Sequence, residues 1–340
     1  MDRLATNLTR SSFLPLYFRK FVWSFKILSP FWPFIIVFGL LANVTNIVVF
    51  LKAGVKDSVT TLLLSLAVSD IAFLIIIVPS VSTQIMLVYV PDWPWPFFSG
   101  FLDQLPYWPA YTFYDFSSFI TVYLGVTRCA CVAMPLKFQS VFTKARTVKA
   151  VLVLFILAVS LRVPVISTFR IIRRTDPQTN MSSLYLSGQN RESINRFNDI
   201  MNRASLPWIN YIIMVTCVCV IKLKLYQASQ VRKTHTSYNK QAEKGQLKQE
   251  RSSKDIRVIQ SVVLICCIFI VSQLPFLVST TGRLIYPAFD IGGRLQFLFF
   301  SFAPVGRTCS YLNASMNIFV HYNYNRKFKA VFLAILKIKQ

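Results

Sequence analysis

Seven stretches of predominantly apolar residues are distributed along the chain. They cover residues 30–51, 58–80, 107–132, 148–168, 206–225, 256–280 and 295–321. The first and fourth approach or reach the roughly 20 apolar residues that a helix needs to cross about 30 Å of hydrocarbon. One such stretch is compatible with a core helix of a soluble protein, but several are not. The pattern therefore predicts an all-α membrane protein built as a seven-transmembrane helix bundle.

The third of these stretches has the weakest apolar pattern. Polar side chains recur along it, namely Thr112, Asp115, Ser117, Ser118 and Thr121. A helix with such groups is stable in a membrane when neighbouring helices surround it and satisfy them. We therefore retain it as a membrane span and regard it as the one that hydropathy alone leaves in doubt.

Beyond the seventh stretch the pattern changes to that of an amphipathic helix. Apolar residues recur at three- and four-residue intervals, beside four lysines, at Phe328, Val331, Phe332, Ile335 and Leu336. This pattern is typical of a helix that lies on a membrane surface. The expected organisation is an N-terminal segment over 1–29, a seven-helix domain over 30–321 and an amphipathic eighth helix with a short tail over 322–340.

The net charge of +24 raises the possibility of nucleic-acid binding. The distribution of the basic residues decides between nucleic-acid binding and a role in membrane topology. A basic footprint alone is a weak sign of such binding. The basic residues lie in the connecting segments, and no compact soluble domain remains once the apolar stretches are set aside. We therefore expect no nucleic-acid partner. The charge indicates topology and attraction to anionic membrane lipid.

The lysines predict which connections are cytoplasmic. All of them except Lys20 and Lys26 fall in or next to 52–57, 133–147, the long polar linker 226–255 and the tail from 322. Lysine-rich connections stay in the cytoplasm. The opposite side then carries the N-terminus and the glycosylation sequons at Asn7 and Asn180. Basic residues before the first stretch argue the other way, but the later connections outweigh them. We predict a multi-pass plasma-membrane glycoprotein with an extracellular N-terminus.

The charged and amide residues within the predicted spans include Asn43, Asp70, Asp115, Arg128, Asn313 and Asn317. Such groups are energetically expensive at membrane depth, so each is a candidate functional residue. Their context is specific: ANVTNIVVF, LSLAVSD, TRC followed by MPL, and NASMNIFVHY followed by NRKF. In this order the segments resemble the rhodopsin-like G-protein-coupled receptors over residues 40–332. The chain is most similar in character to invertebrate chemosensory and FMRFamide-type neuropeptide receptors.

The resemblance implies a function and residue roles. An extracellular ligand would bind the receptor, and its cytoplasmic face would activate a heterotrimeric G protein. Asn43 and Pro207 match helix-packing positions. The positions of the conformational switch and of G-protein coupling are Arg128, Phe269, Gln273, Pro275, Asn317 and His321. The family's sodium pocket is matched by Asp70, Ser117, Asn313 and Asn317. An ion-free hydrogen-bond cluster is the alternative there, and no other cofactor is expected.

The chain departs from the family pattern at several of these positions. Thr127 stands where an acidic residue normally holds Arg128, so Asp255 at the start of the sixth span is the predicted partner instead. Gln273 replaces the sixth-span tryptophan, and His321 replaces the seventh-span tyrosine. These changes leave open a degenerate receptor that binds its ligand without signalling.

The predicted ligand follows from the outer halves of the spans. Ala110 stands where amine receptors of the family carry an aspartate, which disfavours a monoamine. Arg283 and Arg307 lie near the outer ends of the sixth and seventh spans, with Arg162 on the fourth, and guanidinium groups suit carboxylate or phosphate. The other candidate ligand-binding residues are Trp108, Tyr111, Tyr114 and Asp115. We expect a neuropeptide or a small anionic ligand. The alternative is that these arginines reach lipid headgroups and the aromatic residues form an interfacial belt.

Other functions find little support in the sequence. The cysteines form no zinc-binding pattern and are expected to be structural thiols. Asp103 stands where the family's extracellular disulfide needs a cysteine, and residues 169–205 contain none, so we expect no such bridge. No nucleophile or metal-binding pair indicates an enzyme. A ligand-gated channel or a transporter is a further alternative, although no matching halves are visible.

Overall fold

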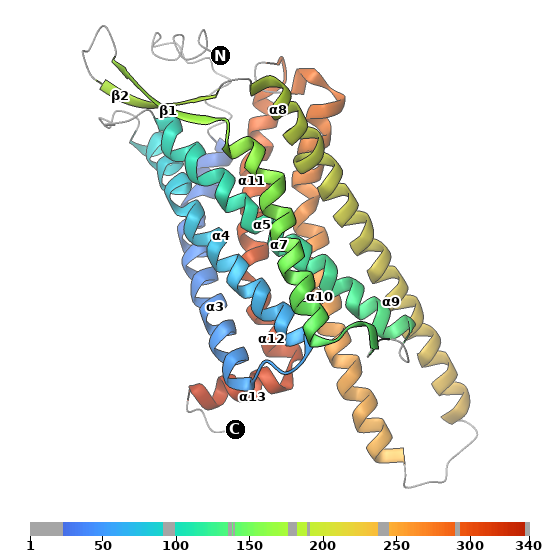
Figure 1. Cartoon of the computed structure of the whole chain (residues 1–340). Helices are drawn as coiled ribbons and strands as arrows, with labels where there is room; N and C mark the ends of the chain where they lie inside the picture. Colours follow the sequence, from blue (N-terminus) through green and yellow to red (C-terminus); the bar gives the residue numbers. More distant parts are fainter. Residues whose placement is uncertain are drawn as a thin grey trace.

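The computed structural model describes residues 23–90, 99–134, 138, 140–175, 182–188, 191–236, 245–289 and 293–336. Figure 1 shows an elongated bundle of helices with a small β-hairpin at one end. The elements are η1 (Ser29–Phe31), α3 (Trp32–Ala53), α4 (Ser58–Tyr89), α5 (Ser99–Ala133), α7 (Lys144–Ile166), β1 (Phe169–Thr175), β2 (Ser182–Gly188), α8 (Arg191–Asn198), η2 (Asp199–Ser205), α9 (Leu206–Thr236), α10 (Gly245–Ile285), η3 (Pro287–Phe289), α11 (Gln296–Ser315), α12 (Asn317–Tyr324) and α13 (Arg326–Ile335).

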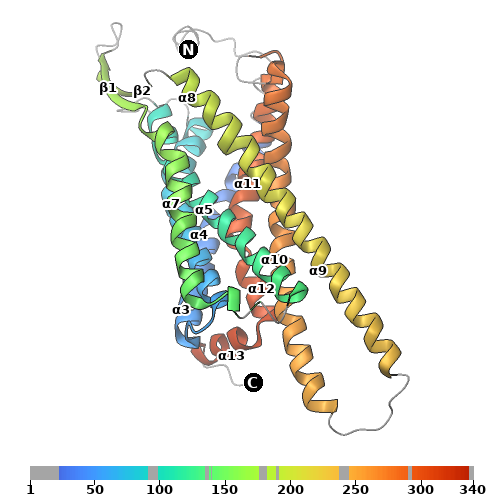
Figure 2. The same cartoon turned by 45° about the vertical axis from the view of Figure 1, so that its right-hand side comes forward.

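The seven predicted spans form the bundle, which confirms the predicted fold class. They are α3, α4, α5, α7, α9, α10 and α11, the last continued by α12 (Figures 1 and 2). Two ends can be distinguished. The hairpin end carries β1 and β2, and the α13 end carries the helix that follows the last span. The described parts of the lysine-rich connections predicted to be cytoplasmic lie at the α13 end (Figure 1).

The polar helix α5 is the central helix of the bundle. It packs against α4, α7, α9 and α10, and its membrane-spanning stretch is the most buried among the candidate spans. The buried serine and threonine hydroxyls of α5 donate mostly to carbonyls one turn back, as Thr121 does to Ser117 at 2.9 Å. This arrangement explains how α5 tolerates its polar groups in a membrane.

By hydropathy alone, the doubtful membrane span is α11 and not α5, which the sequence pattern had left in doubt. Six helical stretches of the described chain are long and apolar enough to span a membrane, and α5 is among them, whereas α11 is not. Arg307 and several serine and threonine residues lower the hydropathy of α11. This helix nevertheless lies inside the bundle, packed against α3 and α10. It ends at Ser315, and α12 resumes at Asn317, so the predicted single span 295–321 consists of two helical segments.

Two connections differ from their predictions. The linker 226–255 is helical wherever the structure describes it, because α9 continues to Thr236 and α10 starts at Gly245. The segment after α7 forms an antiparallel hairpin, in which Phe169 pairs with Gly188 and Thr175 with Ser182. Ile171 and Ile172 are consecutive and both exposed, so this segment lacks the period-two apolar pattern that reveals a strand.

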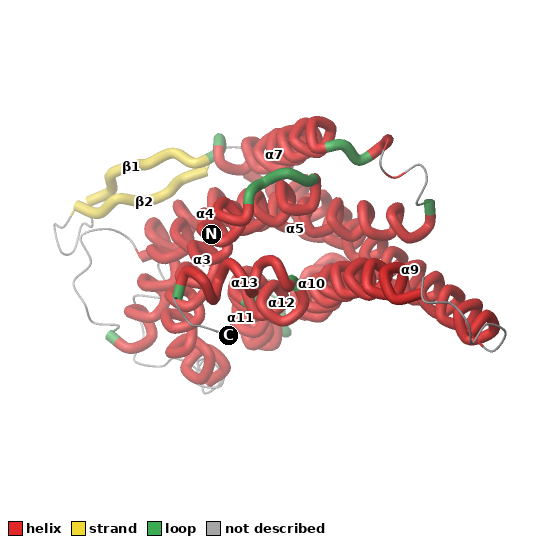
Figure 3. Tube along the Cα trace, turned by 90° about the horizontal axis from the view of Figure 1, so that it is seen from below, coloured by secondary structure: helices red, strands yellow, loops and turns green. Residues whose placement is uncertain are grey.

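The amphipathic eighth helix is present as α13, which crosses the end of the bundle (Figure 3). The side chain of Asn325 caps its start by accepting a hydrogen bond from the amide of Phe328 at 3.1 Å. Phe328 is buried and packs on Phe50 of α3 with 5.4 Å between ring centroids. One apolar residue therefore anchors α13 against the first span.

Candidate functional site

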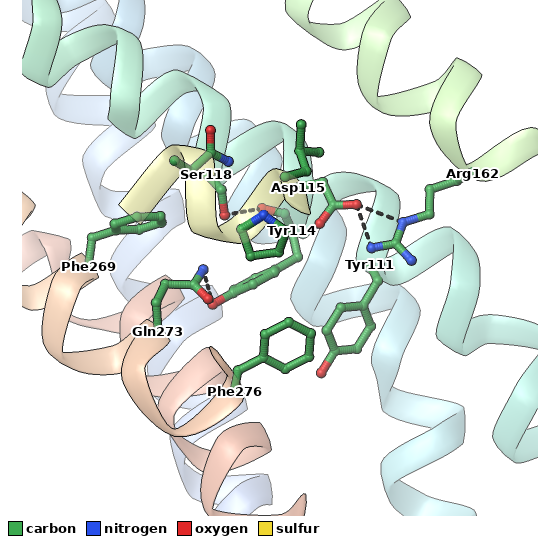
Figure 4. A pocket seen from close by; sticks show the side chains of 11 residues that line it. Tyr111, Tyr114, Asp115, Ser118, Arg162, Phe269, Gln273 and Phe276 are labelled. Carbon is green, nitrogen blue, oxygen red and sulfur yellow. Dashed lines mark hydrogen bonds and ion pairs between the residues drawn. The ribbon is translucent and has the colours of Figure 1, made fainter. Parts of the chain in front are cut away.

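A pocket opens within the hairpin half of the bundle between α5, α7, α9 and α10 (Figure 4). Its lining consists of Tyr111, Tyr114, Asp115, Ser118, Arg162, Leu206, Pro207, Asn210, Phe269, Gln273 and Phe276. The four lining residues of α5 follow one another at spacings of three, one and three, which places them on one face of the helix. Five predicted ligand or switch residues and the helix-packing residue Pro207 meet in this one place.

A buried ion pair forms one wall of the pocket. The Nε and Nη2 atoms of Arg162 both lie 2.6 Å from the same carboxylate oxygen of Asp115. Nη1 of Arg162 also reaches Oδ1 of Asn198 at 3.4 Å. The Arg162 side chain is only 4% exposed. Arg162 therefore does not reach lipid headgroups, and Asp115 carries an internal partner.

Gln273 links α10 to α5 across the pocket. Its Nε2 donates to the hydroxyl oxygen of Tyr114 at 3.0 Å, and both side chains are buried. Phe269, which is one turn earlier on α10 and almost fully buried, lies beside Gln273 in the pocket lining (Figure 4). The residue that replaces the family's tryptophan thus makes a polar contact that tryptophan could not make in the same way.

The aromatic residues of α5 form a continuous packed cluster rather than an interfacial belt. Trp108, Tyr111 and Tyr114 are 5–9% exposed. The ring centroid of Tyr111 lies 5.7 Å from that of Phe73 on α4, and Tyr114 lies 5.1 Å from the same ring. Such contacts fix the rings in place and provide flat apolar walls.

A second charged group lies closer to the hairpin end. Asp199 on η2 accepts from Arg203 at 3.0 Å and from Arg283 at 3.5 Å. The guanidinium of Arg203 stacks on the ring of Trp108 at 5.2 Å, and that of Arg307 lies 5.8 Å from the ring centroid of Tyr107. The sequence analysis missed Asp199 and Arg203. Their four-residue spacing is a signal, but it is common on any helix surface.

Three of the four predicted sodium ligands are joined by hydrogen bonds. Asp70 accepts from Ser117 at 2.7 Å and from Asn317 at 3.0 Å, and all three side chains are buried. Oδ1 of Asn313 instead accepts from Ser272 on α10 at 3.2 Å. These contacts form a buried hydrogen-bond cluster, and sodium binding at these residues stays a prediction. Asn43, in its predicted packing role, donates to the carbonyl of Ala314 at 2.7 Å and joins α3 to α11.

The remaining switch residues lie toward the α13 end or within α10. Arg128 is buried on α5, and Pro275 lies inside α10. His321 packs against the rings of Phe50 and Phe328 at 5.1 and 5.5 Å. The side chain of Asp255 lies outside the described residues, so the bond between Arg128 and Asp255 stays a prediction. The sequons at Asn7 and Asn180 also lie outside them.

All seven cysteines belong to the described part of the chain and are free thiols. No disulfide therefore joins the hairpin to α5, as the sequence led us to expect. Cys217 and Cys266 are buried, whereas Cys219 is exposed, so the expectation of structural thiols does not describe Cys219.

Comparison with models of known protein families gives a match. A family model described as 7 transmembrane receptor (rhodopsin family) matches residues 42–318. This range includes every span from the second to the sixth, about half of the first and most of the seventh. No curated protein matches the chain.

Proposed function

The chain belongs to the rhodopsin family of seven-transmembrane receptors, and from this premise we propose that it binds an anionic extracellular ligand and activates a heterotrimeric G protein. It is a receptor and not an enzyme. The proposed ligand is a neuropeptide or a small chemosensory molecule that carries a carboxylate or phosphate group. Membership of a receptor family argues against the channel and transporter alternatives.

The proposed orientation places the hairpin end outside the cell and the α13 end in the cytoplasm of the plasma membrane. The lysine-rich connections at the α13 end support this orientation. It is tested with epitope tags: a tag within 226–255 should be inaccessible on intact cells. Glycosidase-sensitive mass should be lost when Asn7 and Asn180 are both changed to Gln.

The observation that carries the proposed ligand chemistry is the surplus of guanidinium groups at the hairpin end of the pocket. Arg162, Arg203 and Arg307 adjoin aromatic rings of α5, and Arg283 adjoins Phe299. Among the described residues, the carboxylates that pair with these arginines are Asp115 and Asp199. Positive charge in a partly dry site attracts an anionic group and repels a cationic one. The buried Ala110 offers no carboxylate to an amine.

The proposed route of signalling runs through α10. Ligand that fills the pocket contacts Gln273 and Tyr114, the residues whose hydrogen bond joins α10 to α5. A ligand that favours one arrangement of these helices shifts the population toward it and changes the surface that a G protein meets at the α13 end. The non-signalling alternative is motivated by the same residues, since Gln273 and His321 both depart from the family pattern.

A ligand screen tests both the signalling receptor and the non-signalling alternative. It uses cells that express a promiscuous G protein, with intracellular calcium as the readout. We expect an anionic agonist. Arg283→Ala should weaken its binding by on the order of 2 to 5 kcal/mol, because the ligand charge loses its partner. Arg294→Gln, at an exposed arginine outside the pocket, is the matched control and should leave potency unchanged. Binding without any calcium response would favour the non-signalling receptor, and a cationic agonist would refute the proposed ligand class.

A further inference from the structure

A single carboxylate lies between two arginines at the mouth of the pocket. Asp199 lies on η2, a π-helix, and Arg283 on α10, so their contact joins two segments that are far apart in the sequence. Arg203 approaches the other oxygen of the same carboxylate. Together with Thr280 and Leu284, these three residues line a depression of about 250 Å³, counted with the open space at its mouth.

Both guanidinium groups have positions that do not depend on Asp199. The guanidinium of Arg203 lies 5.2 Å from the ring centroid of Trp108, and that of Arg283 lies 5.3 Å from that of Phe299. A cation held over an aromatic face is stabilised by the ring itself. Removal of the carboxylate would therefore leave two positive groups still directed at one space.

The carboxylate is also an imperfect and accessible partner. Its contact with Arg283 is 3.5 Å, at the long end of the hydrogen-bond range, whereas good charge-assisted contacts are about 2.7 to 2.9 Å. The Asp199 side chain is 25% exposed, so a dissolved anion can reach it. One carboxylate facing two guanidinium groups leaves this cluster with one net positive charge.

We infer that Asp199 is a built-in competitor at the anion-recognition subsite: the carboxylate or phosphate of the ligand takes its place between Arg203 and Arg283. This inference rests on the proposed function and assigns its anionic ligand to a particular subsite. Exchange of Asp199 for a ligand anion would replace a link between η2 and α10 by a link through the ligand. The subsite thereby couples ligand binding to the position of α10.

The inference is tested with a simple anion. Full-length receptor in a maltoside detergent is titrated with inorganic phosphate at constant ionic strength, and the dissociation constant is obtained from the rise in the thermal unfolding midpoint. Asp199→Asn should bind phosphate about tenfold more tightly than the unaltered receptor. Asp199→Glu keeps the competing charge and should remain close to the unaltered receptor. Addition of Arg283→Gln to Asp199→Asn should abolish the gain.

A charge control separates competition from a general electrostatic effect. Tyr286→Lys adds one positive charge at an exposed position three residues beyond Arg283 without removing Asp199. If it tightens phosphate binding as much as Asp199→Asn does, the competitor role is refuted. Asp199→Ser provides the same test if the asparagine variant does not fold.

Lipid headgroups are a second source of phosphate, and a parallel series with added phosphatidylglycerol addresses them. Stabilisation by this lipid but not by inorganic phosphate would overturn the assignment to a dissolved ligand. Phosphate binding that is unchanged or weakened by Asp199→Asn would overturn the competitor role. In either case an anionic agonist in the calcium screen still supports the proposed function, which fails only if that screen finds a cationic agonist or no response.

Discussion

The guanidinium of Arg162 on α7 contacts the carboxylate of Asp115 on α5 at 2.6 Å, and the two side chains are 4% and 13% exposed. Helix α7 otherwise lies at the periphery of the bundle, since only 17% of the residues in its most apolar stretch are buried. One ion pair therefore ties the least buried candidate span to the most buried one and forms a wall of the pocket.

Loss of either partner of this pair should destabilise the receptor strongly. Arg162→Met or Asp115→Leu leaves an uncompensated buried charge, for which about 3 to 5 kcal/mol is typical. The double variant leaves neither charge and should unfold at a higher temperature than either single variant. Thermal midpoints of the purified receptor, measured by tryptophan fluorescence, give this ranking. Additive losses in the double variant would contradict the coupling.

The fold was predictable from the sequence to a greater extent than the site. The spans could be found because a bilayer requires long apolar stretches, and α13 because its apolar residues follow a helical period. The aromatic residues of α5 could be assigned to one face by their spacing. The partners of Arg162 and Arg283 could not be predicted, because Asp115 and Asp199 come from other helices, and pairing across helices leaves no periodic signal. The hairpin was missed because Ile171 and Ile172 of β1 are consecutive and do not follow the alternating pattern of a strand.

The hydrogen bond between Gln273 and Tyr114 should restrain α10. Tyr114→Phe removes the acceptor and leaves the buried amide of Gln273 without this bond, at a cost of about 1 to 3 kcal/mol. We expect ligand-independent signalling to rise, because α10 loses a contact with α5. Basal activity is measured at matched surface expression. Tyr111→Phe is the control, since it removes a hydroxyl from a neighbouring pocket residue with no described bond to α10. Equal basal activity in both variants would show that this hydrogen bond does not restrain α10.

The close packing of the first span against the seventh should require glycine at position 39. A Cβ added to Gly39 would clash with Oγ of Ser315 and would lie 2.7 Å from Cδ1 of Leu74. Gly39→Ala should therefore destabilise the receptor by about 1 to 3 kcal/mol, as overpacking does. Gly306→Ala is the matched control: its Cβ would meet atoms of Phe276 at 3.9 Å, an ordinary contact, and alanine favours the helix by about 1 kcal/mol. The two thermal midpoints should move in opposite directions, and a rise in both would show that helix propensity outweighs packing at Gly39.

The last prediction concerns Asp70, whose two oxygens accept from Ser117 on α5 and Asn317 on α12. Asp70→Asn keeps the shape but replaces one acceptor oxygen by an amino group, so one of the two buried donors loses its partner. The expected loss is about 1 to 3 kcal/mol. Because Asn313 bonds to Ser272 rather than to this cluster, we expect the loss to be the same in sodium chloride and in potassium chloride. Thermal midpoints of the unaltered and Asp70→Asn receptors in the two salts test this. A stabilisation specific to sodium that disappears in Asp70→Asn would instead establish the cation site, because an ion that binds only the folded receptor raises its stability with concentration.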